Sequence, residues 1–245
     1  MDNTQTLEKM KKLRLYGMHT CFENAVETGM IHNFKPDELL SHLIEAEYDE
    51  RCERKLQNLI KNANFRFIAP FESIKFKAER NLNKSQILKL LDFKWLSEGC
   101  NIIITGYTGT GKTFLACAIG LKACMKGFKV GYYNSNKFFY QLKYAKSCGN
   151  YLREFDKIIK QDLIILDDFG LDILDKESRM SLFEILEERT EDKSMMITSQ
   201  VQVENWYDII GEKTIADAIC DRLISKSEFI SLKGDSLRKV ISNNS

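Results

Sequence analysis

One eight-residue stretch, Gly106-Tyr-Thr-Gly-Thr-Gly-Lys-Thr113, restricts the fold of this 245-residue chain more than any other feature. It fits the pattern G-x-x-x-x-G-K-[ST], which requires a strand before it and a helix after it. An apolar run at 101–105 precedes the stretch, and a helical pattern at 113–126 follows it. In such an arrangement the glycines let backbone amides point at phosphate oxygens, and the helix N-terminus adds its positive dipole end. The sequence therefore predicts a phosphate-binding loop, the Walker A motif, in an α/β domain.

The nucleotide is expected to contact this loop and the first turn of its helix. Lys112 would reach the β- and γ-phosphates as a catalytic cation, and the Thr113 hydroxyl would bind Mg²⁺. The pattern predicts ATP or GTP together with Mg²⁺. The predicted contacts are Gly106, Thr108, Gly109, Thr110, Gly111, Lys112, Thr113 and Phe114.

The segment Leu163-Ile-Ile-Leu-Asp-Asp168 supplies the partner motif, Walker B. Its four apolar residues predict a buried strand, which places two acids at the carboxyl end where α/β folds bind ligands. We expect Asp167 to hold the Mg²⁺ shell, and Asp168 to orient and polarise the attacking water. Many proteins with this motif carry a glutamate at the second position. The shorter aspartate leaves open a nucleotide-dependent switch with almost no turnover.

Strand and helix patterns alternate from residue 99 onward, which favours a five-stranded parallel sheet wrapped by helices. We assign 99–245 to this ATPase domain. The expected strands are 101–105, 130–133, 163–166, 195–198 and 229–232, and the expected helices are 113–126, 137–146, 151–160, 176–190 and 214–225.

The segment before this domain has a helical pattern. Residues 1–65 predict a small all-helical domain with a helix break near Gly17 and a helix start at Pro36, where proline and two acids suit a first turn. Residues 66–98 are expected to be a connector with one late amphipathic helix that reaches Trp95.

Composition excludes several classes of protein. The seven cysteines form no Cys-x-x-Cys pair, so neither a zinc site nor a disulfide framework is indicated. No apolar run approaches the ~20 residues that cross a bilayer, and the polar N-terminus does not resemble a secretory signal. We therefore expect a cytoplasmic protein without a membrane partner.

The net charge of +1 hides an uneven distribution. Residues 36–50 carry six acids and no Lys or Arg, whereas residues 51–94 carry eleven Lys and Arg against four acids. This pattern predicts either a polarised module with one face for phosphates, or solvated helix faces whose charges balance in space.

Several phrases resemble the IstB/DnaC group of AAA+ ATPases, over nearly the whole chain. The resemblance implies an AAA+ fold and ATP as the nucleotide. The phrases are Leu163-Ile-Ile-Leu-Asp-Asp-Phe-Gly170, Ile197-Thr-Ser-Gln200, Trp206, Ile215-Ala-Asp-Ala-Ile-Cys-Asp-Arg-Leu223, Leu232-Lys-Gly-Asp-Ser-Leu-Arg-Lys239 and Leu39-Leu-x-x-Leu-Ile-x-x-Glu-x-x-x-Arg51.

The resemblance also implies catalytic roles. Gln200 would be sensor 1, the residue that contacts the γ-phosphate or the attacking water, with Ser199 as the alternative. Arg222 would be an arginine finger that completes a neighbouring subunit's site; the structural alternative is a helix salt bridge with a nearby aspartate, Asp217 or Asp221. Residues 233–245 are too few for a full C-terminal lid, so we expect a truncated lid in which Arg238 could act as a stub.

In DnaC-like proteins the segment that corresponds to 136–146 faces the central channel of an assembly. The resemblance therefore suggests that Lys137, Lys143 and Lys146 neutralise DNA phosphates and that Tyr144 stacks or wedges. The helical spacing of Phe138, Phe139 and Leu142 predicts core positions instead. Weaker DNA candidates are Arg51, Arg54, Lys55 and Lys61.

The implied function is that of an ATPase that forms a homo-oligomer on double-stranded DNA with ATP and assists the transposase of an insertion sequence. The alternative is a DnaC-like loader whose partner is a replicative helicase. A small-molecule kinase is disfavoured by the short C-terminal segment and by the candidate arginine finger.

Overall fold

The computed structural model describes residues 3–76, 80–189 and 193–237, which form two compact units, Met1–Asn58 and Leu59–Ser245. We expected boundaries at residues 65 and 98, whereas contacts divide the chain after Asn58. Residues 66–98 belong to the unit that holds the sheet because their apolar side chains, among them Ile87, Trp95 and Leu96, are buried. Among the described helices, none combines the length and the apolar character that a bilayer crossing requires.

The first unit is helical, as predicted. It contains α1 (Asn3–Lys12), α2 (Tyr16–Glu27), the 3₁₀ turn η1 (Met30–His32) and most of α3 (Pro36–Ala63), so the helix start at Pro36 is confirmed. The predicted break near Gly17 is also confirmed: it falls at residues 13–15, where the chain turns at Arg14, and Gly17 itself lies in the first turn of α2. A Cβ atom at Gly17 would lie 2.2 Å from the Ala46 carbonyl oxygen, so glycine here permits close approach of α2 to α3.

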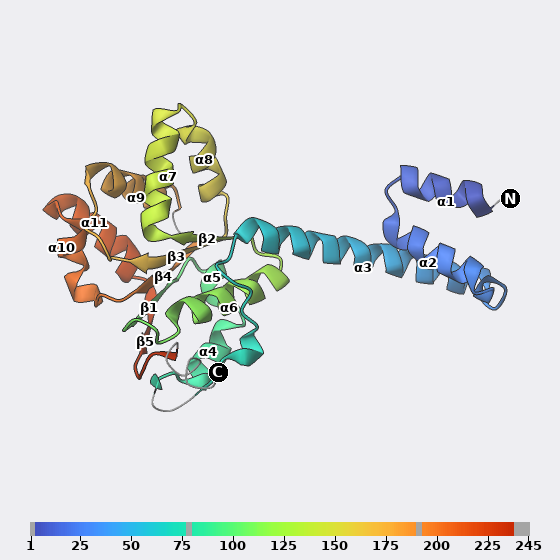
Figure 1. Cartoon of the computed structure of the whole chain (residues 1–245), viewed down its shortest axis with the longest axis horizontal. Helices are drawn as coiled ribbons and strands as arrows, with labels where there is room; N and C mark the ends of the chain where they lie inside the picture. The colour runs from blue at the N-terminus through green and yellow to red at the C-terminus, as the bar shows by residue number, and fades with distance from the viewer. Residues whose placement is uncertain (1–2, 77–79, 190–192, 238–245) are drawn as a thin grey trace. The chain divides into compact units, whose positions relative to one another are not determined.

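The second unit is built on the predicted five-stranded parallel sheet (Figure 1). The strand order is β2-β3-β4-β1-β5, and every neighbouring pair is parallel. All carboxyl ends therefore lie at one edge, where α/β folds bind their ligands. The strands are β1 (Asn101–Gly106), β2 (Val130–Asn134), β3 (Leu163–Phe169), β4 (Ser194–Ser199) and β5 (Ser227–Leu232).

Helices cover both faces of this sheet (Figure 1). Successive residues of a strand point to opposite faces, so Ile164 joins the core beneath α7, α9 and α11, while Ile165 reaches Gly120 of α6. The helices are α4 (Lys84–Leu90), α5 (Lys94–Ser97), α6 (Lys112–Met125), α7 (Ser135–Ser147), α8 (Tyr151–Ile159), α9 (Lys176–Glu188), α10 (Trp206–Ile210) and α11 (Lys213–Ile224), with 3₁₀ turns η2 (Phe71–Ser73) and η4 (Val203–Asn205).

The core residues of α7 match the prediction, whereas the helices of the connector do not. Phe138, Phe139 and Leu142 are buried against the sheet, which confirms their core assignment. The single late helix expected in the connector is instead two helices, α4 and α5. The chain turns between them at Phe93, whose φ of 58° lies in the left-handed region.

Candidate nucleotide site

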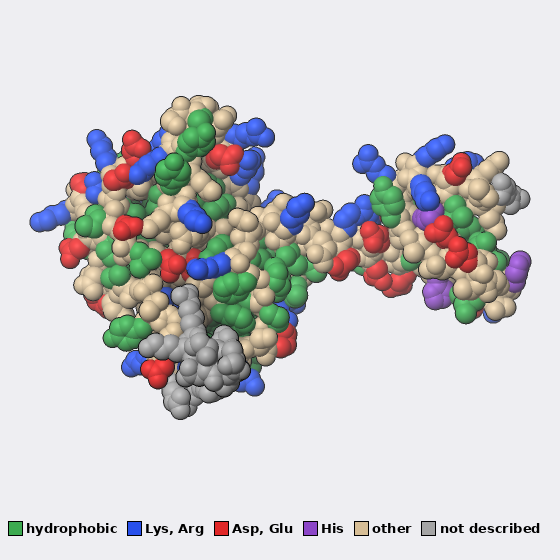
Figure 2. All heavy atoms as spheres, viewed as in Figure 1, with side chains coloured by type: hydrophobic (Ala, Val, Ile, Leu, Met, Phe, Trp, Pro, Cys, Tyr) green, Lys and Arg blue, Asp and Glu red, His purple; other side chains and the backbone are tan. Residues whose placement is uncertain are grey.

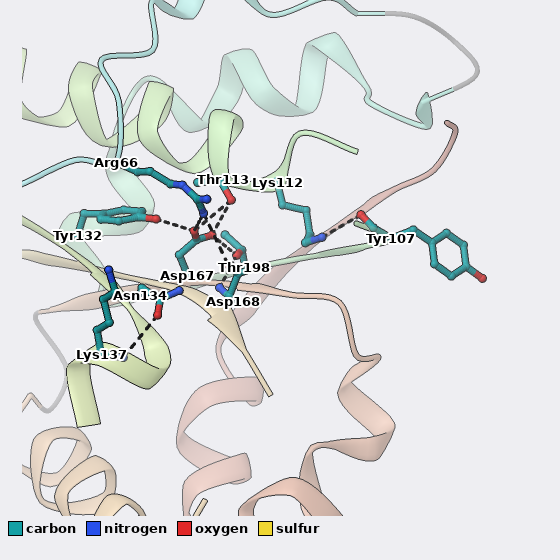
Figure 3. Close-up of polar contacts among 10 residues, drawn as sticks. All are labelled: Arg66, Tyr107, Lys112, Thr113, Tyr132, Asn134, Lys137, Asp167, Asp168 and Thr198. Carbon is teal, nitrogen blue, oxygen red and sulfur yellow. Dashed lines mark hydrogen bonds and ion pairs between the residues drawn. The ribbon is translucent and has the colours of Figure 1, made fainter. Parts of the chain in front are cut away.

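The phosphate loop connects β1 to α6 and curls around the Lys112 ammonium group (Figure 3). Lys112 Nζ donates to the carbonyl oxygens of Gly106 at 2.7 Å and Tyr107 at 3.0 Å, and the residue is only 5% exposed. Gly111 caps the helix with a φ of +92°, a conformation that favours glycine. The loop thus places one cation and the amino end of a 14-residue helix at a single point.

A cavity of about 580 Å³ opens in front of this loop, a size typical of small-molecule and cofactor sites. Six of the eight predicted contacts line it: Thr108, Gly109, Gly111, Lys112, Thr113 and Phe114. Gly106 and Thr110 are not among the residues that line this cavity. The buried Thr110 hydroxyl donates to the Tyr107 carbonyl oxygen at 2.8 Å, so it shapes the loop from behind.

The Walker B aspartates lie at the end of β3, beside the loop (Figure 3). Asp167 is fully buried, and its carboxylate accepts hydrogen bonds from Thr113 Oγ1 at 2.9 and 3.1 Å. Asp168 sits at an irregularity of the β3–β4 register and has a φ of 59°. Its carboxylate lines the nucleotide cavity, whereas Asp167 is reached through Thr113.

These oxygen atoms suit a magnesium ion. A hydroxyl and a carboxylate in contact are hard ligands of the kind Mg²⁺ takes, with nucleotide phosphates and water completing its shell. Within the residues that the structure describes, no group of three or more His, Cys, Asp or Glu side chains could hold a metal ion, so a metal here would also need ligands from the nucleotide and water. Thr113 and Asp167 would hold the metal here, as the sequence predicted.

Two further donors to Asp167 escaped the sequence analysis. Thr198 Oγ1 donates to Asp167 Oδ1 at 2.5 Å and also accepts the Asp168 N–H at 3.1 Å. The Tyr132 hydroxyl donates to Asp167 Oδ2 at 2.5 Å. Burial, and then this hydrogen bond, raise the pKa of Tyr132, so the hydroxyl remains a donor. Thr198 adjoins the chosen sensor residues, but nothing in the pattern of β2 singled out Tyr132.

The two sensor candidates on β4 have different surroundings. Gln200 lines the nucleotide cavity, next to Asp168 and the phosphate loop. Ser199 is buried and its hydroxyl donates to the Phe169 carbonyl oxygen at 2.7 Å, so it holds β3 and β4 together. The geometry therefore favours Gln200 for contact with a bound nucleotide, and its sensor role stays a prediction.

Arg222 lies on α11 and is not among the residues that line the nucleotide cavity. Its guanidinium forms an ion pair with Glu187 of α9 and stands 5.2 Å from the centroid of the Phe183 ring. The carboxylate partner is thus on another helix, rather than Asp217 or Asp221 as the structural alternative supposed. Arg222 remains partly exposed, and its role as an arginine finger stays a prediction. Arg238 lies outside the described residues.

The connector supplies an unexpected part of the cavity wall. Arg66 Nη1 lies 3.8 Å from Asp167 Oδ2 and 3.7 Å from Asp168 Oδ2 (Figure 3). Arg80 also lines the cavity and donates to the Thr110 carbonyl oxygen. The rings of Phe67 and Phe114 stack with centroids 6.0 Å apart. Arg66, Phe67 and Arg80 were assigned only to the connector, because no spacing in the sequence connects them to the motifs.

The DNA-binding candidates on α7 are partly engaged within the chain. Lys143 forms an ion pair with Asp175, and the Lys146 ammonium lies 4.4 Å from the Tyr151 ring centroid. Tyr144 is 63% exposed, and Lys137 lines a polar cavity beside Asp168. Figure 2 shows Lys and Arg side chains spread among acidic ones on the visible face of this unit. DNA contact by these residues stays a prediction.

The Asp175 pair gives a direct test of Lys143. Hydrogen bonds from Lys143 and Ser178 lower the pKa of Asp175 to about 2, so it is charged at neutral pH. Asp175→Asn keeps an oxygen that accepts the Ser178 N–H and so caps the start of α9, and it releases Lys143. We expect duplex DNA to bind about two- to fivefold more tightly, the range for a surface ion pair, by fluorescence anisotropy at fixed salt.

Asp172→Asn is the matched control, because Asp172 carries the same charge in the same loop but contacts Asn136 instead of a lysine. Equal gains from both variants would mean that net charge, rather than Lys143, produces the effect.

The strand order assigns a class to this site. Because β4 lies between β1 and β3, its tip lies next to both the phosphate loop and the two aspartates, and the AAA+ class of P-loop proteins has this arrangement. The fold is similar to that of a DnaC helicase loader, with a TM-score of 0.56 at 20% identity over 71% of this chain and 98% of the other. AMPPCP-bound DnaA from Aquifex aeolicus gives a TM-score of 0.60 at 20% identity over 74% and 55%.

Residues 8–245 match the family of IstB-like ATP-binding proteins, and the chain belongs to that family. A putative insertion sequence ATP-binding protein from Sinorhizobium fredii is 38% identical over 96% of both chains. The putative ATP-binding protein of insertion sequence IS5376 from Geobacillus stearothermophilus is 30% identical over 94% of this chain and 92% of the relative. Family and fold class agree with the resemblance that the motifs indicated.

Proposed function

We propose that this chain is an ATPase that assembles on double-stranded DNA and assists the transposase of an insertion sequence. The observation that carries the proposal is the convergence of Lys112, Thr113 and Asp168 on one cavity at the carboxyl edge of the sheet, with Asp167 hydrogen-bonded to Thr113. Similarity over nearly the full chain to proteins described as insertion sequence ATP-binding proteins supports the transposition context.

The residues divide the chemistry between them. A bound Mg²⁺ ion would neutralise charge on the phosphates. Lys112 would exchange its two loop carbonyls for phosphate oxygens, which suits a charge-assisted hydrogen bond. Asp168 would orient the attacking water, and Gln200, on the same cavity wall, would contact the terminal phosphate.

Assembly would supply what one copy lacks. Arg222 does not line its own cavity, so its predicted role requires a second copy. A single subunit offers few phosphate contacts on α7, because Lys143 and Lys146 are engaged within the chain. Several copies on one duplex would multiply these contacts, and nucleotide at the subunit junction would control how many copies gather.

Light scattering of the full chain tests this proposal in four conditions: alone, with ATP, with duplex DNA, and with both. We expect an oligomer when ATP and duplex are both present. Replacement of ATP by ADP is the control for nucleotide state. A monomer in all four conditions would refute the assembly model.

A replicative helicase loader is the second candidate, because the fold is similar to that of a DnaC helicase loader. Its nucleotide chemistry would be the same, so only the protein partner distinguishes the two. Binding of the purified chain to the transposase of an insertion sequence from the same host, compared with binding to the host's replicative helicase, separates these candidates.

A further inference from the structure

Asp167 is enclosed by four side chains. Thr113, Tyr132 and Thr198 donate hydrogen bonds to it at 2.5 to 3.1 Å, and Arg66 completes the enclosure. The carboxylate is 0% exposed. A metal ion that binds Thr113 and Asp167 would therefore enter a space that these side chains already surround, next to the one cation among them, Arg66.

Arg66 is the partner that is held most loosely. Its Nη1 atom is 3.8 Å from the Asp167 carboxylate, beyond hydrogen-bond distance, and its side chain is 46% exposed. The three hydroxyls are neutral and donate at short range. Arg66 is also a full positive charge, so it would repel an incoming cation while the hydroxyls would not.

Arg66 also contacts the second acid. Nη1 lies 3.7 Å from Asp168 Oδ2, so one guanidinium faces both the metal-binding and the water-orienting carboxylate (Figure 3). Without a cation, two adjacent carboxylates at a strand end repel each other. Arg66 thus supplies the charge balance that Mg²⁺ would supply with nucleotide bound.

We propose that Arg66 stands in for the metal cation in the nucleotide-free protein and is exchanged for Mg²⁺ when the metal–nucleotide complex binds. The inference rests on the proposed nucleotide site. Arg66 is a positioning residue in this account. It holds Asp167 and Asp168 in place until the metal arrives, and then it moves away.

The surroundings provide a place for the displaced guanidinium. Arg66 and Asp168 line both the nucleotide cavity and a polar cavity of about 470 Å³ on its other side. The side chains of Asn64, Asn134 and Gln141 line this second cavity and offer oxygen acceptors. Arg66 follows the end of α3 at Ala63 by three residues, so the exchange would move the connector.

Binding of Mn²⁺ to the full chain without nucleotide, followed by electron paramagnetic resonance, tests the proposal. Arg66→Gln removes the competing charge, and we expect Mn²⁺ to bind about five- to tenfold more tightly, somewhat above the range of an exposed ion pair because Asp167 is buried. Arg66→Lys keeps the charge and should stay within about twofold of wild type. Arg153→Gln, an exposed arginine on α8, is the matched control and should cause no change.

A double variant locates the metal. Asp167→Asn in the Arg66→Gln background should abolish the gain in Mn²⁺ affinity. Equal or weaker Mn²⁺ binding by Arg66→Gln would overturn the proposal, as would a gain that survives Asp167→Asn. No nucleotide or DNA enters these measurements, so they can succeed or fail independently of the ATPase and assembly experiments.

Hydrogen exchange provides a second readout. Exchange at residues 64–68 should rise when Mn²⁺ is added to a complex with a non-hydrolysable ATP analogue, relative to the same analogue with a chelator. Unchanged or slower exchange on metal addition would contradict the displacement of Arg66.

Discussion

The Lys112→Ala variant should lose nucleotide binding, with an affinity at least about 100-fold below wild type, because charge-assisted hydrogen bonds to phosphate are among the strongest in proteins. The ammonium is buried in the curled loop, where the low local dielectric strengthens its attraction for phosphate. Calorimetric titration with ATP in the presence of Mg²⁺ measures the effect. Assembly on DNA should fail in the same variant.

Lys122→Ala is the matched control. Lys122 lies on the same helix, α6, but pairs with the exposed Glu72 away from the phosphate loop, so its loss should leave ATP affinity within about twofold, as for most surface ion pairs. The thermal unfolding temperature should be measured for both variants, because Lys112 also donates hydrogen bonds to two loop carbonyls and its loss could destabilise the fold. If a folded Lys112→Ala protein bound ATP with near wild-type affinity, the assignment of residues 106–113 as the phosphate-binding loop would be wrong.

The Arg222→Ala variant should bind ATP normally but lose DNA-stimulated hydrolysis by about 1000-fold, the lower end of the range for arginine fingers. The reason is geometric: Arg222 is outside the cavity of its own subunit and retains exposed surface toward solvent. Steady-state phosphate release with saturating duplex DNA measures the loss. Glu187→Gln, which removes the partner of Arg222 without removing the arginine, should hydrolyse at least as fast as wild type.

Mixed assemblies make this test sharper. A chain with Asp168→Asn keeps Arg222 but lacks the acid that we propose orients the water. We expect it to be inactive by itself and still to offer Arg222 to a neighbour. Mixing it with Arg222→Ala should restore part of the hydrolysis if the arginine acts between subunits. Normal turnover by Arg222→Ala alone, or no recovery on mixing, would count against the finger.

The sequence predicted the parts of the site that depend on local spacing. Lys112 and Thr113 are fixed by the loop pattern, and Asp167 and Asp168 by an apolar strand that ends in two acids. The parallel sheet followed from the alternation of strands and helices. Each motif is determined by residues within one strand–loop–helix unit, and the sheet by the repetition of such units, which is why one sequence suffices to predict them.

Contacts between distant segments could not be predicted in this way. Arg66 and Tyr132 reach the Walker B acids from the connector and from β2, and neither belongs to a motif. The helix break near Gly17 could be predicted, but the role of the glycine could not. Gly17 is required because α2 packs closely against Ala46 of α3, a contact between residues distant in the sequence.

The backbone at Asp168 has a consequence for which amino acids this position can accept. A φ of 59° lies in the left-handed region, which Asp and Asn tolerate and β-branched side chains do not. The aspartate, which is shorter than the glutamate common in other proteins with the motif, is therefore matched to the curvature of its own main chain. Replacement by Val or Ile should strain the turn itself, whereas Asn should remove the charge and preserve the shape of the strand end.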